Sequence, residues 1–110
     1  MNFITGQIIA GGFAAAGITL PLPAGNLPAK NAVYGIRPEH LSLTNTGLPA
    51  TVLLVEPMGS ETQVTLQLGE HQIIGIFRER VRTQPGQTIH IQPDLSLVHL
   101  FDADTGQRLN

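Results

Sequence analysis

The stretch from residue 62 to residue 68, Thr-Gln-Val-Thr-Leu-Gln-Leu, decides the fold class of this chain. Its even-numbered side chains are mostly apolar, and its odd-numbered side chains are polar. A period of two is that of a β-strand, because a helix would scatter these side chains around its axis. Gly69 and Glu70 follow at once and predict a tight hairpin into a second strand over residues 71–77.

Similar short runs of Val, Ile, Leu and Thr lie on both sides of this hairpin, separated by twelve Gly and eight Pro. That rhythm is typical of an all-β sandwich or barrel of seven or eight short strands with little helix. The run Ala50–Val55 is apolar on both faces apart from Thr51, so we expect a central strand covered on both sides. The other predicted strands are residues 3–10, 17–22, 32–36, 88–92 and 97–101.

The segments between these strands carry turn signals. Three prolines make residues 21–28 a loop, since proline lacks the N–H that a strand needs. Residues 37–41 are expected to form one helical turn, with Pro38 at its first position and Glu39 at its positive end. Residues 45–47 predict a turn, and Gln84-Pro85-Gly86-Gln87 predicts a type II turn.

The bulk composition favours one small domain spanning residues 1–110. Charged residues make up 13 % of the chain, against about 25 % in an average globular domain, so we expect a partner to cover part of the surface. The absence of cysteine excludes disulfides and thiolate metal sites. No apolar run approaches the roughly 20 residues that cross a bilayer. The N-terminus lacks the basic and apolar regions of a secretory signal.

The charge distribution argues against nucleic acid as a partner. The net charge is −2 and only six residues are Lys or Arg. A nucleic-acid binder needs cations along its footprint to displace the counterions of phosphates. Arg78, Arg80 and Arg82 are interrupted by Glu79 and are interpreted as a charged edge strand that discourages aggregation.

The motifs of catalysis are missing from this sequence. There is no phosphate-binding G-x-x-x-x-G-K-[ST] loop, and the only lysine is Lys30. Ser42, Ser60 and Ser96 lack the G-x-S-x-G elbow of a nucleophile. We therefore predict no catalytic residue, no cofactor site and no enzymatic activity for this chain.

Histidines and aspartates suggest two metal sites that the spacing does not support. His90 and His99 lie near the ends of what we expect to be neighbouring strands, but zinc needs three or four converging ligands. Asp102, Asp104 and Gly106 resemble a fragment of a calcium loop, yet they lack its third ligand and its bidentate glutamate. We expect exposed histidines and an ordinary Asp-Gly turn, with no metal.

The loop at residues 56–61 is the best candidate for a recognition surface. Glu56 and Glu61 flank Pro-Met-Gly-Ser. Paired carboxylates can serve as acid and base, but here they bracket a bend between two strands, and a surface turn explains them. An apolar Met58 between fixed charges is nonetheless suited to binding, because loops held by strands commonly carry it.

Three segments carry a resemblance to a known family. They are Gly-Ile-Arg-Pro-Glu-His-Leu at residues 35–41, Val-Glu-Pro-Met-Gly-Ser-Glu-Thr-Gln at residues 55–63, and His-Leu-Phe-Asp at residues 99–102 followed by Gly106. In this order and spacing they resemble the C-terminal regulatory region of ATP-binding subunits from sugar-type ABC importers, including the maltose and glycerol-3-phosphate transport ATPases. That region is the TOBE, or transport-associated OB, domain. The opening Met-Asn-Phe resembles the segment that follows the ATPase domain in that group.

The resemblance implies an OB-fold-like β-barrel of short antiparallel strands with additional strands packed on it. It implies that an ATPase domain is expected upstream and that this domain pairs with its twin in a homodimer. It also implies a cytoplasmic location at the inner face of the plasma membrane, through a complex with transmembrane permease subunits. Because the chain lacks Walker, signature and switch motifs, it is not expected to hydrolyse ATP by itself.

In the maltose-type members this domain also receives inhibitory signals from a cytoplasmic regulatory protein. The resemblance therefore implies a protein-interaction site formed by six residues: Glu39, His40, Glu56, Met58, Ser60 and Glu61. Two alternatives remain open. One is a small-ligand or oxyanion sensor, against which stands the lack of a Ser/Lys-rich anion loop. The other is an OB-fold nucleic-acid binder, which needs stacking aromatics on a cationic groove, whereas the chain has one Tyr and four Phe.

Overall fold

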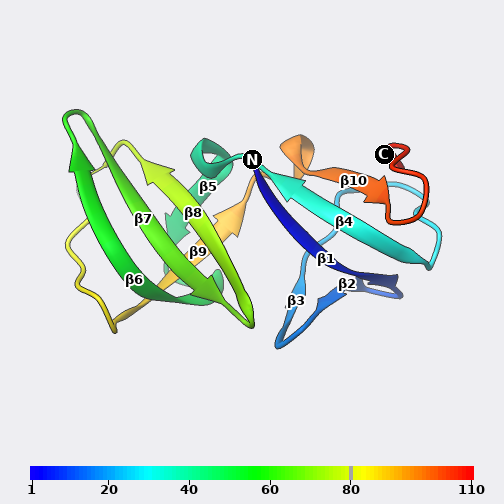
Figure 1. Cartoon of the computed structure of the whole chain (residues 1–110), viewed down its shortest axis with the longest axis horizontal. Helices are drawn as coiled ribbons and strands as arrows, with labels where there is room; N and C mark the ends of the chain where they lie inside the picture. The colour runs from blue at the N-terminus through cyan, green and yellow to red at the C-terminus, as the bar shows by residue number, and fades with distance from the viewer. Residues whose placement is uncertain (80) are drawn as a thin grey trace.

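The computed structural model describes residues 1–79 and 81–110, which form ten strands and two 3₁₀ helices (Figure 1). The strands are β1 (Asn2–Ile9), β2 (Gly12–Ala15), β3 (Ile18–Leu20), β4 (Asn31–Ile36), β5 (Leu41–Thr44), β6 (Leu48–Met58), β7 (Glu61–Leu68), β8 (His71–Phe77), β9 (Thr88–Pro93) and β10 (His99–Asp102). The helices are η1 (Pro38–His40) and η2 (Leu95–Leu97). The prediction of an all-β chain with little helix is confirmed.

The strands form two antiparallel sheets that lie end to end. The first sheet has the order β10-β4-β1-β2-β3, and the second has the order β5-β9-β6-β7-β8. In the second sheet, the edge strand β8 contacts both η1 and the opposite edge strand β5, so this sheet curls into the expected OB-like barrel. The first sheet supplies the additional strands. The resulting molecule measures 39 × 24 × 23 Å along its principal axes.

The hairpin of β7 and β8 confirms the strongest local prediction. Its register runs from Thr62 opposite Phe77 to Leu68 opposite His71. Gly69 has a φ of 59°, which suits the first position of a two-residue type II′ turn. The predicted turn at residues 84–87 is also present: the Gln87 N–H donates to the Gln84 carbonyl oxygen at 3.1 Å, and Gly86 has a φ of 92°.

The strand count of seven or eight is wrong, because the described residues contain ten strands. Strand β2 is absent from the predicted strands, since Gly12, Ala14 and Ala15 have little intrinsic preference for strands. Pairing with β1 on one side and β3 on the other makes these residues a strand. Strand β5 was missed because it has four residues and follows η1 directly.

The prediction that Ala50–Val55 is covered on both faces is wrong. These residues belong to β6, which does lie centrally between β9 and β7. Ala50 and Val52 are buried, but Leu53 and Leu54 are 41 % and 48 % exposed, respectively. A bulge between Val52 and Leu54 shifts the register there. An antiparallel sheet can leave one face uncovered, so an apolar run alone does not prove burial on both sides.

The last strand begins later than predicted. Residues 95–97 form η2, and β10 starts at His99. The Asp94 carboxylate accepts a hydrogen bond from the Ser96 N–H at 3.1 Å and so caps the N-terminus of η2. This cap favours a short helix where the sequence analysis predicts the start of a strand. Leu97 therefore lies outside the sheet and is exposed.

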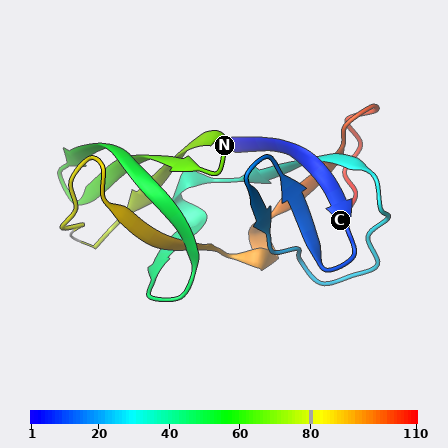
Figure 2. The same cartoon turned by 90° about the horizontal axis from the view of Figure 1, so that it is seen from below.

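At the junction between the two sheets, which we call the seam, one side chain makes the pair of hydrogen bonds that the backbone of a neighbouring strand would make. The Asn2 amide donates from Nδ2 to the Ile74 carbonyl oxygen at 2.8 Å and accepts at Oδ1 from the Ile74 N–H at 2.8 Å. The Glu70 N–H also donates to the Ala16 carbonyl oxygen at 2.9 Å, joining two turns across the seam. Figure 2 shows β1 reaching the second sheet at the chain's N-terminus.

Apolar side chains from both sheets form one continuous core. In the first sheet, the rings of Phe13 and Tyr34 pack with their centroids 5.3 Å apart, and the Tyr34 hydroxyl donates to the Pro21 carbonyl oxygen at 2.8 Å. Burial raises the pKa of the Tyr34 hydroxyl. In the second sheet, Val64 and Leu66 of β7 are fully buried. One shared core is consistent with the predicted single domain.

Asp102 is the last residue of β10, and its side chain holds the turn that follows. Its carboxylate pairs with the Lys30 ammonium group and accepts hydrogen bonds from the N–H groups of Asp104 and Thr105 at 2.8 and 3.1 Å. This arrangement is the Asp-Gly turn that the sequence predicts, with Gly106 at a φ of 76°. The hydrogen bond from Lys30, followed by those from the two backbone N–H groups, lowers the pKa of Asp102 from 3.8 to about 2.

This shift predicts how stability depends on acid pH. Because the pKa of Asp102 is lower in the folded chain, ionisation of Asp102 stabilises the fold above about pH 3.8, and that stabilisation is lost as the pH falls towards about 2. Asp102→Asn should therefore melt at a lower temperature than wild type near neutral pH, and the difference should shrink across this acid range. Thermal unfolding followed by circular dichroism measures it, with Glu70→Gln, at an exposed carboxylate, as control. A difference that stays constant across that range would contradict the role of the Asp102 charge.

A candidate protein-docking surface

The short helix η1 presents two of the predicted interaction residues. Pro38 occupies its first position, where a missing N–H costs nothing, and the His40 N–H donates to the Arg37 carbonyl oxygen at 3.0 Å. The His40 carbonyl oxygen accepts from the Asp94 N–H at 3.0 Å, which anchors the helix to the chain just after β9. The predicted helical turn is thus confirmed, and it holds Glu39 and His40 beside β8.

The β6–β7 hairpin presents the remaining predicted residues. Met58 lies opposite Glu61 in the register, and Gly59 and Ser60 make the two-residue turn between them. Gly59 has a φ of 74°, a conformation that suits glycine at the first position of a type II′ turn. Met58 is 56 % exposed.

The structure brings Glu39, His40 and Glu61 together around one depression. This η1 hollow has a volume of about 560 Å³, and the side chains of Arg78 and Glu79 also line it. A second depression of about 510 Å³, the hairpin hollow, contains Ser60 and shares Arg78 and Glu79 with the first. Four of the six predicted residues therefore lie on two adjoining hollows.

Glu56 and Met58 lie apart from both hollows. They alternate with Val55 and Pro57, which line the hairpin hollow, so Glu56 and Met58 point to the opposite face of β6. Both side chains are exposed. The predicted site is therefore divided between a pair of hollows at the end of the second sheet and the outer face of that sheet.

The charges around the hollows are mixed. The Arg78 guanidinium lies 3.8 Å from the Glu61 carboxylate, and the Arg78 side chain is almost fully exposed. A solvent-exposed pair of this kind contributes little stability, about 0–1 kcal/mol, so both groups are available to a partner. Glu39 and Glu79 add two further carboxylates. Sequence reasoning missed the part that Arg78 and Glu79 play, although their position directly after the predicted strand 71–77 could have indicated it.

The interpretation of the arginines as an edge strand is wrong where it can be assessed. Arg78 and Glu79 lie in a bend after β8, and Arg82 lies in an irregular segment. Arg80 lies outside the described residues. Strand β8 ends at Phe77, so the charges follow the edge of the sheet and do not form part of it.

The histidines do not form a metal site. His90 lies on β9 in the second sheet and His99 on β10 in the first, so the expectation that they occupy neighbouring strands is wrong. Burial, followed by the charges of Arg108, Arg37 and His40, lowers the pKa of His99. Among residues 1–79 and 81–110, no three His, Cys, Asp or Glu side chains are arranged to hold a metal ion.

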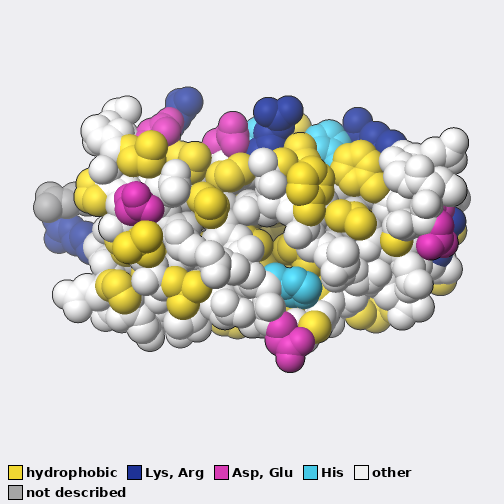
Figure 3. Space-filling view, in the orientation of Figure 1, with side chains coloured by type: hydrophobic (Ala, Val, Ile, Leu, Met, Phe, Trp, Pro, Cys, Tyr) yellow, Lys and Arg dark blue, Asp and Glu magenta, His cyan; other side chains and the backbone are white. Residues whose placement is uncertain are grey.

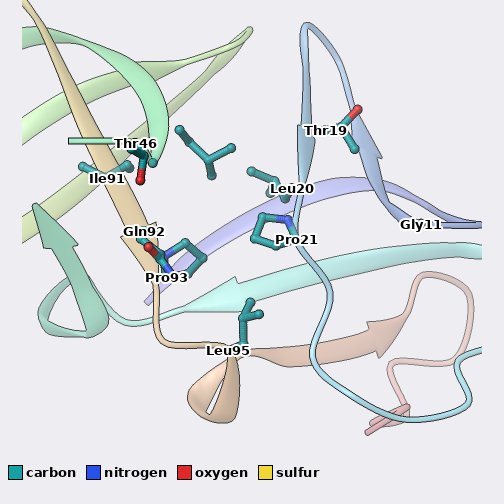
Figure 4. A pocket seen from close by; sticks show the side chains of 11 residues that line it. Gly11, Thr19, Leu20, Pro21, Thr46, Ile91, Gln92, Pro93 and Leu95 are labelled. Carbon is teal, nitrogen blue, oxygen red and sulfur yellow. The ribbon is translucent and has the colours of Figure 1, made fainter. Parts of the chain in front are cut away.

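A third depression, the inter-sheet cavity, lies between the two sheets and has a volume of about 400 Å³. Figure 4 shows Leu20 of β3 and Pro21, which follows it, on one side, with Ile91 and Pro93 of β9 facing them. Its remaining lining consists of Gly11, Thr19, Thr46, Gly47, Leu48, Gln92 and Leu95. The lining is neutral and mostly apolar, and it offers no carboxylate, imidazole or ammonium group for chemistry.

No helix in the part of the chain that the structure describes is long and apolar enough to cross a membrane.

Comparison with known proteins identifies the family. The family model of the TOBE domain matches residues 34–101, more than half of the chain, and the model of the MalK OB fold domain matches residues 1–41. The chain is 45 % identical over 95 residues to an uncharacterized ABC transporter ATP-binding protein, y4oS, of Sinorhizobium fredii, an alignment that covers 84 % of this chain and 26 % of that protein.

Two further relatives have names that include a transported solute. The chain is 32 % identical over 120 residues to the sulfoquinovosyl glycerol transport ATP-binding protein SmoE of Agrobacterium fabrum, covering 100 % of this chain and 34 % of the relative. It is 30 % identical over 117 residues to the sn-glycerol-3-phosphate import ATP-binding protein UgpC of Escherichia coli, covering 99 % and 33 %. The chain thus spans about a third or less of the length of these relatives. The matched segment includes η1, the β6–β7 hairpin and most of β10, and it places this chain in the TOBE domain family.

Proposed function

We propose that this chain is a regulatory and dimerisation domain, non-catalytic by itself, of the ATP-binding subunit of an ABC importer for a sugar or sugar-phosphate-like solute. Membership of the TOBE family carries the proposal. The names of relatives that transport sulfoquinovosyl glycerol and import sn-glycerol-3-phosphate support the solute class. The partial coverage of these relatives supports an ATPase domain elsewhere in the parent subunit.

The docking surface supports the regulatory part of the proposal. The η1 hollow and the hairpin hollow are built from segments far apart in the sequence, and they adjoin each other and expose carboxylates, a guanidinium and a serine. A surface of this kind suits another protein, whose side chains can reach into both hollows. Under this proposal Glu39, His40, Ser60 and Glu61 contact a regulatory protein, and Glu56 and Met58 extend the interaction area.

The proposal also implies where the domain is located and which protein subunits it contacts. The domain is attached to its own ATPase domain, pairs with the twin domain of a second subunit, and reaches the inner face of the plasma membrane through permease subunits. Regulators that bind it would act by favouring one of two arrangements of the paired subunits, since a ligand shifts an equilibrium only through its differential affinity.

Removing this domain from the parent subunit tests the proposal. Deleting the segment that corresponds to residues 1–110 is expected to leave nucleotide binding within about twofold of the intact subunit, while the dimer in the absence of ATP is lost. Equilibrium nucleotide binding and sedimentation velocity measure the two properties. Loss of nucleotide binding on deletion, or an unchanged dimer together with unchanged regulation, would contradict the proposed role.

A single charge reversal tests the docking surface. Glu61→Lys in the parent subunit should leave the basal ATPase rate unchanged and raise by about tenfold the concentration of regulatory protein needed for half-maximal inhibition, because it places a like charge beside Arg78. Glu70→Lys makes the same charge change in the β7–β8 turn, at the other end of β7, and should have no effect. Equal effects of the two variants would show that net charge, and not the η1 hollow, determines regulation.

The inter-sheet cavity supports a second candidate, a small-ligand sensor. Its lining residues include no Lys or Arg, so a neutral, partly apolar molecule fits it better than an oxyanion does. A ligand that binds only the folded chain raises the melting temperature by mass action. A concentration-dependent rise with a neutral sugar-like solute would favour this candidate over protein docking.

A further inference from the structure

The outer edge of β10 carries a row of backbone groups that point away from its sheet. Among the described residues β10 is the last strand of the first sheet, paired with β4 on its inner side only. Four groups project from the outer edge: the Val98 carbonyl oxygen, the N–H and carbonyl oxygen of Leu100, and the Asp102 N–H. A row of this kind is a template on which another extended chain can add.

Two of these four groups pair with the backbone of residues 107–110, which we call the tail. The Asp102 N–H donates to the Gln107 carbonyl oxygen at 2.7 Å. The Leu109 N–H donates to the Leu100 carbonyl oxygen, also at 2.7 Å. The tail thus pairs antiparallel with β10, as an added edge strand would. Figure 1 shows the C-terminal segment turning back towards β10.

The other two groups pair with a side chain. Oδ1 of Asn110 accepts from the Leu100 N–H at 2.9 Å, and Nδ2 donates to the Val98 carbonyl oxygen at 2.8 Å. An amide side chain offers a donor and an acceptor as a peptide group does, so Asn110 continues the row in place of a backbone. Asn2 does the same on β8, where its amide pairs with the N–H and carbonyl oxygen of Ile74.

The tail is held by few apolar contacts. Leu109 is partly buried and packs against the core, whereas Gln107, Arg108 and Asn110 are exposed. In Figure 3, the upper right of the molecule, where Figure 1 places the C-terminus, is mostly uncharged polar side chains and backbone. Segments with few buried apolar contacts open locally at a low cost in free energy. Opening of the tail exposes the row on β10 while the rest of the chain stays folded.

We propose that the outer edge of β10 is a strand-addition site for an extended segment of a partner protein, and that the tail keeps this site closed. The tail itself shows what fits: a segment antiparallel to β10 with a leucine followed directly by an asparagine. In this mode of recognition, backbone hydrogen bonds provide affinity and side chains provide specificity. The site shares no residue with the η1 hollow or the hairpin hollow, so it goes beyond the proposed function.

The tail sets a threshold for binding in trans. It follows β10 after a short turn, so it competes with a partner segment at an effective concentration of roughly millimolar, as short linkers give. A segment that makes only the same contacts therefore binds the intact chain weakly. Removing contacts of the tail should raise the affinity of the chain for a segment added from outside.

Amide hydrogen exchange of the full 110-residue chain, followed by NMR, tests whether the tail closes the edge. Asn110→Ala removes the acceptor of the Leu100 N–H, and this amide should exchange about tenfold faster or more than in wild type. The amide of Phe101, which lies opposite Val33 on β4, should be unchanged. The matched control is Asn26→Ala at an exposed asparagine in a loop, which should leave both amides unchanged. Equal exchange of Leu100 in Asn110→Ala and wild type would contradict the closed edge.

Peptide binding tests the strand-addition site itself. The open variant combines Leu109→Ser with Asn110→Ala, and circular dichroism confirms that it is folded. The probe is a fluorescent peptide with the sequence of residues 105–110, and fluorescence anisotropy measures its dissociation constant. The open variant should bind it at least about tenfold more tightly than wild type, whose own tail competes. A peptide carrying the same two substitutions should bind neither chain, and Asn26→Ala should match wild type.

The contrary outcomes are distinguishable. Faster exchange of Leu100 without peptide binding to the open variant would overturn the strand-addition site and leave the tail as a protective cap. Equal peptide binding to wild type and the open variant would overturn the closing role of the tail. An open variant that dimerises in sedimentation velocity without binding the peptide would overturn the assigned partner in favour of a second copy. None of these results would decide the proposed function, which the domain deletion and Glu61→Lys test separately.

Discussion

Phe13→Ala should lower the free energy of unfolding by about 3–5 kcal/mol, the usual cost of truncating a buried phenylalanine. Phe13 is 0 % exposed and packs against Tyr34 with a 5.3 Å distance between ring centroids. The packing is tight because Gly6 has no side chain: a Cβ there would lie 2.7 Å from the Phe13 ring. Since a domain of this kind is stable by about 5–15 kcal/mol in total, the loss would be a large fraction of its stability.

Urea denaturation monitored by circular dichroism measures this effect. The matched control is Phe3→Ala, which removes the same ring from an exposed position and should change stability by less than about 0.5 kcal/mol. Comparable losses from the two variants would contradict the position of the core. Tyr34 adds a second readout, because burial raises the pKa of its hydroxyl and mild alkali should ionise it more readily in the destabilised variant.

Leu66→Ala should cost about 2–5 kcal/mol, through lost burial and the cavity left behind. Leu66 is 0 % exposed in the centre of the second sheet, with Val52 and Ile73 opposite it on the neighbouring strands. The same denaturation experiment measures the effect. Leu54→Ala is the matched control in that sheet, because Leu54 is half-exposed and its truncation should cost much less.

Leu66→Ala also tests whether residues 1–110 form a single domain. Tyr34 is the only tyrosine, there is no tryptophan, and Tyr34 lies in the first sheet, so its fluorescence reports on that sheet alone. In one cooperative unit, the fluorescence transition should shift as far as the circular dichroism transition. If Leu66→Ala left the fluorescence midpoint unchanged, the two sheets would unfold separately and the single-domain prediction would be wrong.

The sequence predicts those parts of the fold that depend on local chemistry. The hairpin at residues 62–77 is predictable because the alternation has a period of two and glycine supplies the left-handed turn residue. The sequence could not predict that Gly12–Ala15 is a strand, since small residues gain strand geometry only from partners distant in the chain. Burial of Val52 and exposure of Leu54, two residues apart in one apolar run, depend on a bulge that no local pattern indicates.

The candidate site was predictable in its residues but not in its arrangement. The sequence indicates Glu39 and Glu61 as candidates, although they are 22 positions apart. They reach the same hollow because β5 and η1 lie against β8. Arg78 and Glu79 complete that hollow without belonging to any recognisable motif. The rings of Phe3 and Phe101, which lie 6.5 Å apart between centroids, join the two ends of the sequence, and no spacing argument connects residues so far apart.

The pair of hydrogen bonds at Asn2 requires an amide side chain at this position. An asparagine amide slowly loses ammonia and becomes a carboxylate. An aspartate at position 2 would keep an oxygen to accept from the Ile74 N–H, but its other oxygen would face the Ile74 carbonyl, where Nδ2 now donates. One attraction would become a repulsion between two oxygens. The two sheets would then be joined by one hydrogen bond fewer, while the bond from the Glu70 N–H to the Ala16 carbonyl oxygen and the shared core would remain.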